Sequence, residues 1–160
     1  MTQESTGNLR IRPMVPGDRA FILSLASRLE TVGMPPWRDP EQMHAFHQHY
    51  AEATVNASAL HEAVFIAESD EELLGVVHVM ESSSGLTGER QGYVATLAVT
   101  EASAGQGVGR ALMEAAEAWC RERGLTVIAL DVFAQNSGAR AFYERLGYLE
   151  ETLTMIKNLS

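Results

Sequence analysis

Three glycines at alternate positions, Gly105, Gly107 and Gly109, stand directly in front of helix-forming residues in the segment EASAGQGVGRALMEAAEAW, residues 101–119. A glycine inside a regular element costs roughly 1 kcal/mol relative to alanine, so these positions indicate that the backbone itself is needed there. The preceding YVATLAV (93–99) is typical of a strand, and the following residues predict a helix over about 107–123. The chain is therefore constrained to contain a strand–turn–helix unit built around a glycine turn.

A glycine turn at the start of a helix can bind an anion. The first N–H groups of a helix have no acceptor within it, and bare glycines let a phosphate approach them closely. A flexible turn that is merely rich in glycine explains the same residues. Two familiar phosphate motifs are excluded: G-x-G-x-x-G fails at Arg110 and Leu112, and no Gly-Lys pair exists for a Walker loop.

The composition limits the classes of partner. The 160 residues carry 21 acidic and 12 basic side chains, a formal charge of −9, which argues against nucleic acid and anionic membranes as partners. Neither an N-terminal apolar leader nor a membrane-length apolar stretch is present, so we expect a cytoplasmic protein. Cys120 is the only cysteine and is expected to be a buried thiol, and His44 and His47 have no clear third ligand, so no metal is expected.

Strand-like and helix-like patterns alternate along the rest of the chain. They predict a single α/β domain over residues 1–160, with 1–8 as a flexible tail, in which helices cover both faces of one mixed sheet. A break at 31–40 separates two helices, and Met43, Phe46 and Tyr50 form the expected buried stripe of the second helix. The remaining expected elements are a strand at 9–14, a hairpin around the acidic DEE turn, a loop at 81–92, a buried strand at 125–133, a helix from Asn136 to near Gly147 and a closing strand ETLTMIKNL.

A second segment, LDVFAQNSGARAFYERLGY (130–148), places Asn136 at a helix start and Ala139 and Tyr143 on one helix face. Alone, these residues are equally typical of a helix cap and a core tyrosine. Together the two segments resemble the GCN5-related N-acetyltransferase (GNAT) family. Its signature Arg/Gln-x-x-Gly-x-Gly/Ala is similar to AGQGVG (104–109), and its later Asn-x-x-Ala-x-x-x-Tyr-x-x-x-Gly-Phe/Tyr matches through Gly147 and Tyr148.

The resemblance implies a three-layer fold with a mixed sheet of six to seven strands and about four helices. It also implies that acetyl-CoA enters a cleft where strands 93–99 and 125–133 splay apart. Tyr143 would lie near the thioester sulfur and act as general acid when an amine attacks the acetyl group. The residues that would bind the co-substrate are Leu97, Ala98, Val99, Gly105, Gln106, Gly107, Val108, Gly109, Arg110, Asn136, Ala139 and Tyr143.

The sequence departs from the family pattern in two places. Ala104 stands where Arg or Gln usually begins the glycine signature, which removes a side-chain contact to phosphate. Many relatives carry a glutamate base in the preceding strand, where this chain has Ala95 and Thr96. Glu89 and His78 are the candidate bases, and ordered water could also take the proton.

The acceptor is expected to be a small primary amine, held near residues 30–50, where Met34, Trp37, Phe46 and Tyr50 could wall a pocket. A protein N-terminus or lysine is the alternative acceptor. Two further alternatives are a non-catalytic acyl-CoA-binding regulatory domain and a different nucleotide-binding enzyme. Assembly into a homodimer stays open at this point.

Overall fold

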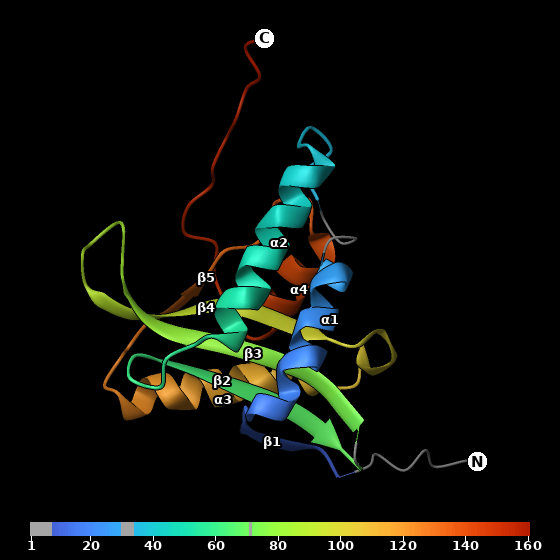
Figure 1. Cartoon of the computed structure of the whole chain (residues 1–160). Coiled ribbons are helices and arrows are strands. Elements are labelled where there is room, and N and C mark those ends of the chain that lie inside the picture. The colour runs from blue at the N-terminus through green and yellow to red at the C-terminus, as the bar shows by residue number, and fades with distance from the viewer. Residues whose placement is uncertain (1–7, 30–33, 71) are drawn as a thin grey trace.

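One five-stranded sheet runs through the computed structural model, which describes residues 8–29, 34–70 and 72–160 (Figure 1). Its strands follow the spatial order β1-β2-β3-β4-β5. They are β1 (Arg10–Pro13), β2 (Glu62–Ser69), β3 (Glu72–Ser83), β4 (Arg90–Val99) and β5 (Ile128–Leu130). The helices are α1 (Arg19–Leu29), α2 (Pro40–Val55), α3 (Val108–Glu122) and α4 (Ser137–Arg145), with short 3-10 turns η1 (Pro16–Asp18) and η2 (Glu101–Ser103).

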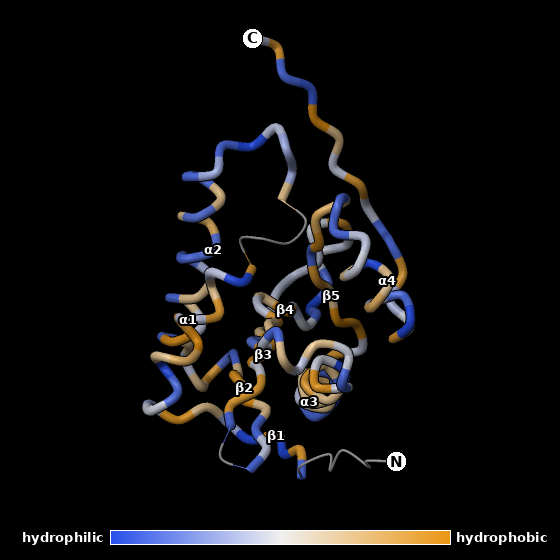
Figure 2. The backbone as a smooth tube through the Cα atoms, turned by 90° about the vertical axis from the view of Figure 1, so that its right-hand side faces the viewer, coloured by the Kyte–Doolittle hydropathy of each residue, from blue (hydrophilic) through white to orange (hydrophobic). Residues whose placement is uncertain are grey.

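Helices cover both faces of the sheet, which confirms the predicted three-layer α/β fold. Figure 2 shows α1 and α2 on one side of the strands and α3 on the other. Val108, Leu112, Met113, Ala116 and Trp119 recur at helical spacing and give α3 an apolar face, which packs on β2, β3 and β4. A second core lies under α1, where Ile22 and Leu25 meet Ile66 and Val76 of the sheet.

Strand pairing is antiparallel from β1 to β4 and parallel between β4 and β5. The parallel ladder is short: it joins Gly92, Tyr93 and Val94 to Ile128, Ala129 and Leu130. Beyond Val94, β4 continues to Val99 beside β3 alone, within the part of the chain described. The two strands therefore part after three residue pairs, as the predicted splay of 93–99 and 125–133 requires.

The sheet has fewer strands than the six to seven expected, because the segment ETLTMIKNL (151–159) forms none. A strand persists only where its N–H and C=O groups find partners, and this segment lies exposed beyond α4. The strand expected over 125–133 is limited to 128–130, since β4 supplies partners only to that point. The expected loop at 81–92 is also shorter, because pairing of β3 with β4 extends from Ser83 and Arg90 inward.

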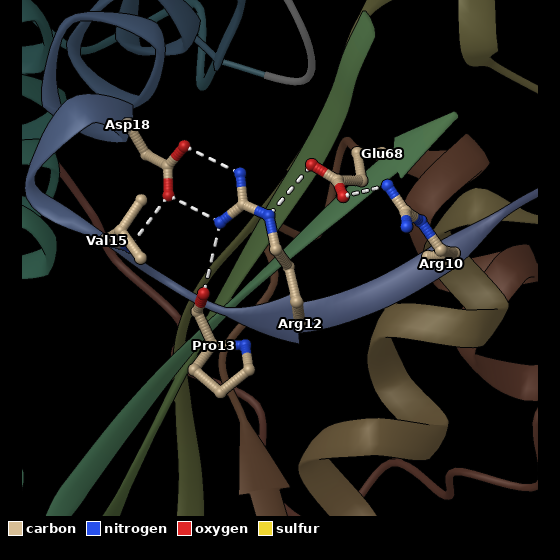
Figure 3. A network of polar contacts seen from close by, with 6 residues as sticks. All are labelled: Arg10, Arg12, Pro13, Val15, Asp18 and Glu68. Carbon is tan, nitrogen blue, oxygen red and sulfur yellow. Dashed lines mark hydrogen bonds and ion pairs between the residues drawn. The ribbon is translucent and has the colours of Figure 1, made fainter. Parts of the chain in front are cut away.

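An arginine links the first strand to the start of the first helix (Figure 3). The Arg12 guanidinium donates two hydrogen bonds to the Asp18 carboxylate, at 2.8 and 2.9 Å, and its Nε donates to Glu68 Oε2 at 2.8 Å. Asp18 also accepts from the Val15 N–H at 2.8 Å. The hydrogen bonds from Arg12 hold the pKa of the Asp18 carboxyl below its usual range. The network thereby fixes α1 on the sheet.

Two expectations fall partly on residues outside those described: the tail at 1–8 and the helix break at 31–40. The described part of that break, 34–39, contains a turn before α2 begins at Pro40, with the Asp39 side chain accepting from the Glu41 N–H at 3.2 Å. Of the helices formed by the described residues, none combines the length and the hydropathy needed to cross a bilayer.

Candidate functional site

A cleft of about 950 Å³ opens where β4 and β5 separate. This volume is at the upper end of the range found for small-molecule sites, so it suits a large ligand. One wall is the free part of β4, and another is the chain that follows β5. The cleft is completed by side chains and backbone from α2, the glycine turn and α4; its lining includes Tyr50, Ala95, Thr96, Leu97, Ala98, Val99, Gly105, Gly107, Gly109, Arg110, Asp131, Phe133, Asn136, Ala139 and Tyr143.

The three glycines of the turn are needed for two different reasons. Gly105 and Gly107 have φ of +76° and +82°, a left-handed conformation that other residues adopt only with strain. A Cβ at either position would meet no heavy atom within 4 Å, so space is not the constraint. At Gly109 a Cβ would lie 3.1 Å from Phe142 Cζ, so this glycine lets α3 and α4 approach closely. The turn therefore places bare backbone at the mouth of α3.

The other residues predicted for the same turn take different places. Arg110 is exposed and lines the cleft, so its cation stands beside the helix start. Gln106 is not a lining residue, and its Nε2 donates to the Ala102 carbonyl at 3.0 Å. Val108 is 3% exposed because its side chain belongs to the core under α3. Their side chains are therefore not placed to contribute to an anion site, and of their backbone groups the Gln106 N–H already donates to the Ser103 carbonyl at 3.2 Å.

The free stretch of β4 and the start of α4 face each other across the cleft. Leu97, Ala98 and Val99 line it with their strand, which pairs with β3 on its other edge. Asn136 caps α4, its Oδ1 accepting from the Ala139 N–H at 3.0 Å, as the cap interpretation of the sequence predicts. Asn136 also lines the cleft, so the side chain that caps α4 is exposed to the space where a ligand would lie.

Tyr143 lies in the cleft wall on α4 and packs edge-on against Phe142 and Tyr148, with ring centroids 5.0 and 5.7 Å away. Burial raises the pKa of its phenol to about 12. The hydroxyl therefore keeps its proton throughout the neutral range and can donate it. The Tyr143 side chain is partly buried and also lines the cleft, so it is not solely a core residue, which was the alternative expected from the sequence.

Aromatic side chains gather at the end of the cleft near α2. Phe46 on α2 and Phe133 after β5 have ring centroids 6.0 Å apart, and Phe46 also packs on Tyr50 at 4.8 Å. The Tyr93 hydroxyl donates to Asp131 Oδ2 at 2.6 Å, at the point where β4 and β5 part. The apolar character and the carboxylate of Asp131 make this end suitable for an organic cation.

The buried stripe of α2 differs from the expected one. Met43 is buried as predicted, but Phe46 and Tyr50 line the cleft instead of the core. The core side of α2 is formed by Met43, His47, Ala51 and Thr54. Met34 and Trp37 are not lining residues, and Trp37 is exposed. Tyr93 and Asp131 were not predicted from the sequence, because the hydrogen bond between them depends on the register of a three-residue ladder.

A chain of buried polar side chains leads away from the cleft under α2. Thr96 lines the cleft, and its hydroxyl is hydrogen-bonded to that of Thr54 at 3.1 Å. Thr54 Oγ1 lies 3.2 Å from His78 Nδ1, and His78 Nε2 lies 2.6 Å from Glu62 Oε2. His78 and Thr54 are fully buried, whereas the Glu62 side chain is 25% exposed. This row of polar side chains thus connects the cleft to solvent.

The two candidate bases differ in their relation to the cleft. Glu89 is exposed in the turn between β3 and β4 and is not a lining residue. His78 does not line the cleft either, but it contacts the cleft through Thr54 and Thr96. Its direct neighbour on β4 is Thr96, the residue noted in the sequence where an acid is usual. Thr96 in place of an acid was the only feature of the sequence that pointed to this row of polar side chains.

Burial lowers the pKa of the His78 imidazole, although Glu62 opposes the shift. For Glu62, burial raises the pKa, but hydrogen bonds from the Ser58 N–H and from His78 outweigh burial and lower it overall. At neutral pH, His78 is therefore a neutral ring beside a carboxylate. Its Nε2 carries the proton donated to Glu62, which leaves Nδ1 as an acceptor facing Thr54.

Cys120 is buried as predicted, and burial raises the pKa of its thiol to about 11. A Cβ on Gly92 would lie 2.3 Å from its Sγ, so the thiol fills the space between α3 and β4. Within the described ranges, His, Cys, Asp and Glu side chains form no group of three or more suited to a metal ion.

Known proteins resemble this chain in sequence and in fold. The family model described as "Acetyltransferase (GNAT) family" matches residues 26–148. N-alpha-acetyltransferase 30 of Schizosaccharomyces pombe is 33% identical over 84 residues, which are 52% of this chain and 55% of that protein. The crystal structure of a GCN5-related N-acetyltransferase from Ralstonia eutropha is 20% identical, covers 95% of this chain and 99% of that one, and has a TM-score of 0.72.

A structure of AAC(6')-Iy in complex with a bisubstrate analogue, CoA-S-monomethyl-acetylneamine, has a TM-score of 0.70 at 20% identity and covers 96% of this chain and 99% of that one. At this identity the structural likeness concerns the fold. The chain spans about half the length of the first curated relatives that it matches.

Proposed function

The chain belongs to the acetyltransferase (GNAT) family, and on that premise we propose that it transfers an acetyl group from acetyl-CoA to a primary amine in the cleft between β4 and β5. One observation carries the proposal: a single cleft joins a side-chain-free helix start, an open strand edge, a protonated tyrosine and an aromatic end with a carboxylate. Each part matches a different portion of the two substrates.

The glycine turn suits the diphosphate of coenzyme A. The backbone of residues 105–110 leads into the start of α3 at Val108, where the helix dipole favours negative charge, and Arg110 adds a cation. Within this stretch the Gln106 N–H is already bonded to the Ser103 carbonyl, so the other N–H groups would bind the diphosphate. Ala104, which stands where the usual polar side chain is absent, lines the same cleft as Arg110. The free edge of β4 at Leu97–Val99 offers main-chain groups to the pantetheine arm, in the manner of strand addition. Asn136 and Ala139 would contact the same arm from α4.

Bound there, acetyl-CoA supplies a thioester carbonyl for attack by the amine. Tyr143 is proposed as the general acid that donates a proton to the departing sulfur. An ordinary thiol has a pKa near 8.5, roughly 3.5 units below the value of about 12 for Tyr143, a gap that opposes full transfer by about 5 kcal/mol. The burial that raises the pKa of the phenol also raises that of a thiolate beside it, which narrows the gap. The hydrogen bond from Tyr143 therefore strengthens as charge develops on sulfur, and on this proposal the proton is transferred once the thiolate has formed in the buried cleft.

An ammonium has no lone pair for attack, so the acceptor must lose one proton before its bond to the acetyl carbon forms, and we propose that Thr96, Thr54, His78 and Glu62 carry that proton out of the cleft. The second proton leaves the nitrogen as the thiol departs and replaces the proton that Tyr143 gives to sulfur. The Thr54 hydroxyl has one proton and three neighbouring acceptors: the Tyr50 carbonyl at 2.8 Å, Thr96 and His78 Nδ1. Because a hydroxyl rotates, it can turn from Tyr50 to His78 while it accepts from Thr96.

The transfer balances along this row of hydrogen bonds. Thr96 takes the amine proton and gives its own to Thr54, whose proton passes to His78 Nδ1. His78 then releases its Nε2 proton to the Glu62 carboxylate, from which it reaches solvent. Each hydroxyl gives one proton and takes one, and only Glu62 changes its charge state. His78 is thus proposed to act as a base at a distance, and Glu89 has no comparable path.

The acceptor proposed is a small primary amine, which is cationic before it reacts. Asp131, Tyr93 and the aromatic pair Phe46 and Phe133 would attract and enclose it. The test is release of free thiol from acetyl-CoA across a panel of primary amines, with short peptides carrying a free N-terminus or a lysine as the second arm. Turnover confined to the peptides would replace the small amine by the alternative acceptor. Coenzyme A binding with no thiol release in either arm would indicate a regulatory domain.

A further inference from the structure

Asp131 is the only acidic side chain among the described residues that line the cleft. Its Oδ2 accepts the hydrogen bond from Tyr93, whereas its Oδ1 accepts none from a described residue. Of the described basic side chains, none forms an ion pair with it. Asp131 is also exposed, so a ligand that enters the cleft can reach the open oxygen. The carboxylate is therefore available for a cation that the ligand brings.

Tyr93 fixes the position of this carboxylate. Burial raises the pKa of the Tyr93 phenol far above its usual value, and Asp131 and Tyr50 raise that pKa further. The hydroxyl therefore keeps its proton and remains the donor to Asp131. Phe133 and Phe46 of α2 line the same cleft, with ring centroids 6.0 Å apart. Aromatic faces beside a carboxylate attract an alkylammonium, so this end of the cleft is suited to a cation on a short hydrocarbon chain.

Contact with a carboxylate opposes the reaction of an amine. The attacking nitrogen must be a free base, whereas a neighbouring carboxylate favours the ammonium and raises its pKa. The proposed path for the proton begins at Thr96, a different residue of the cleft wall. Among the described residues, Asp131 has no hydrogen bond to that path. The cleft thus has one place for a cation that persists and another for an amine that reacts.

The spacing of the two places limits the length of the acceptor. Tyr93 and Thr96 both lie on β4, and each contacts α2: Thr96 through Thr54, and Tyr93 through Tyr50. Tyr50 and Thr54 are about 6 Å apart along the axis of α2, whereas the strand advances by about 10 Å from Tyr93 to Thr96. An extended chain advances by about 1.2 Å per bond, so two nitrogens joined by about four to seven carbon atoms fit this spacing.

We propose that the acceptor is a linear diamine, which binds Asp131 through one ammonium while its other nitrogen, as a free amine beside Thr96, attacks the acetyl group. The inference rests on the proposed acetyl transfer and names the class of amine. At the reacting nitrogen a bond to the acetyl carbon forms, and the bond from that carbon to sulfur breaks. One proton of this nitrogen leaves through Thr96, and the second replaces the proton that Tyr143 gives to sulfur. The nitrogen at Asp131 keeps its protons and its charge.

The first test compares 1,5-diaminopentane with 5-aminopentan-1-ol, which has the same length but a hydroxyl in place of the second amine. Thiol release from acetyl-CoA should give a kcat/KM about tenfold higher or more for the diamine, because only the diamine brings a cation to Asp131. In Asp131→Asn, which preserves the size of the side chain, the ratio of the two kcat/KM values should fall to about one. Glu122→Gln, which removes an exposed carboxylate outside the cleft lining, should keep the ratio of the natural chain. Equal kcat/KM values in the natural chain, or an unchanged ratio in Asp131→Asn, would overturn the proposal.

A calorimetric titration separates this proposal from the acetyl transfer on which it rests. With coenzyme A present, the Kd of 1,5-diaminopentane should rise about tenfold in Asp131→Asn. If that rise occurs but no amine releases thiol, Asp131 remains a cation site, and the acetyl transfer is refuted together with the role of the diamine as acceptor. If the amino alcohol reacts and the Kd of the diamine does not change in Asp131→Asn, the transfer stands and the diamine is refuted.

The number of acetyl groups in the product gives a third test. After one transfer, the remaining amine can react only when the acetylated end lies at Asp131, where the neutral amide brings no charge. Mass spectrometry should therefore show the monoacetylated diamine accumulating while the diamine is consumed. A diacetylated product formed as fast as the monoacetylated one would contradict the requirement for a second cation.

Discussion

Replacing Thr54 by valine cuts the proposed proton path at its centre without changing the shape of the side chain. Among the described residues, the Thr54 hydroxyl is the side-chain group that joins Thr96 in the cleft to His78, at 3.1 and 3.2 Å. Positioned acid–base groups typically contribute 10²- to 10⁴-fold to a rate. Water in the cleft can still take the proton from the amine, so we expect kcat to fall at the lower end of that range, by about a hundredfold.

The same change has a cost in stability that must be separated from its effect on catalysis. Thr96 and His78 are buried and would each lose a hydrogen-bond partner, which costs about 1–3 kcal/mol in the free energy of unfolding. Thr54→Ser is the matched control, because it loses a methyl group but keeps the hydroxyl. Thermal unfolding should therefore show both variants destabilised, whereas thiol release from acetyl-CoA with the best amine of the panel should fall only in Thr54→Val.

The pH dependence distinguishes a proton path from a packing effect. Because the pKa of His78 is lowered, its ring is neutral above the usual value of 6.5 and accepts a proton from Thr54. As pH falls through the lowered pKa, Nδ1 becomes protonated and the path closes. The ratio of natural to Thr54→Val rates should thus be largest above pH 6.5 and shrink at lower pH, with Thr54→Ser following the natural chain. A ratio that is constant with pH, or equal rates for the two variants, would refute the proton path.

Three further predictions concern the acid, the anion site and the fold. Tyr143→Phe should lower kcat by at least tenfold while the Kd for coenzyme A, measured by calorimetry, changes little; equal turnover would remove Tyr143 as the acid. Gly107→Val should weaken coenzyme A binding at least tenfold, whereas Gly124→Val, with a similar strained φ of +71° away from the cleft, should share its loss of stability but bind normally. Asp18→Asn should lower the free energy of unfolding by about 1.5–3 kcal/mol at pH 7. Because the pKa of Asp18 is lowered in the fold, its contribution to stability is present above pH 4 and is lost below that pH. The free energies of unfolding of the natural chain and the variant, measured by denaturant titration, should therefore converge in acid. Arg10→Gln, which removes an exposed ion pair, should change the free energy of unfolding little.

Sequence patterns were sufficient for the parts of the fold that are governed by local interactions. The glycine turn was predictable because positive φ at Gly105 and Gly107 and a helix-forming run after them are properties of a few adjacent residues. The three layers followed from helical and strand periodicities, which report which face of each element is apolar. Asn136 as a cap and Cys120 as a buried thiol are local features of the same kind.

The missed features depend on pairing between distant segments. The length of β5 is set by where it diverges from β4, after the pair Val94–Leu130, and nothing within LTVIALDVF marks that point. The pattern ETLTMIKNL is typical of a strand, but the structure forms none over these residues, so this prediction was wrong. A pattern of side chains cannot show whether the main chain of a segment reaches a partner strand.

The proposed proton path would move the role of the missing glutamate to other residues without losing it. At Thr96 the strand presents a hydroxyl, which is a far weaker base than a carboxylate. Thr96 alone therefore cannot remove the proton from the proposed amine. The residue opposite Thr96 in the β3–β4 ladder is His78. His78 is hydrogen-bonded to Glu62, which lies on β2 two residues before Val64, the residue that pairs with His78. A carboxylate is therefore still present, but it lies at the surface, where being charged costs little, and two hydroxyls and an imidazole connect it to the cleft. On this proposal the cleft keeps its apolar character for the amine, and the base keeps its contact with water.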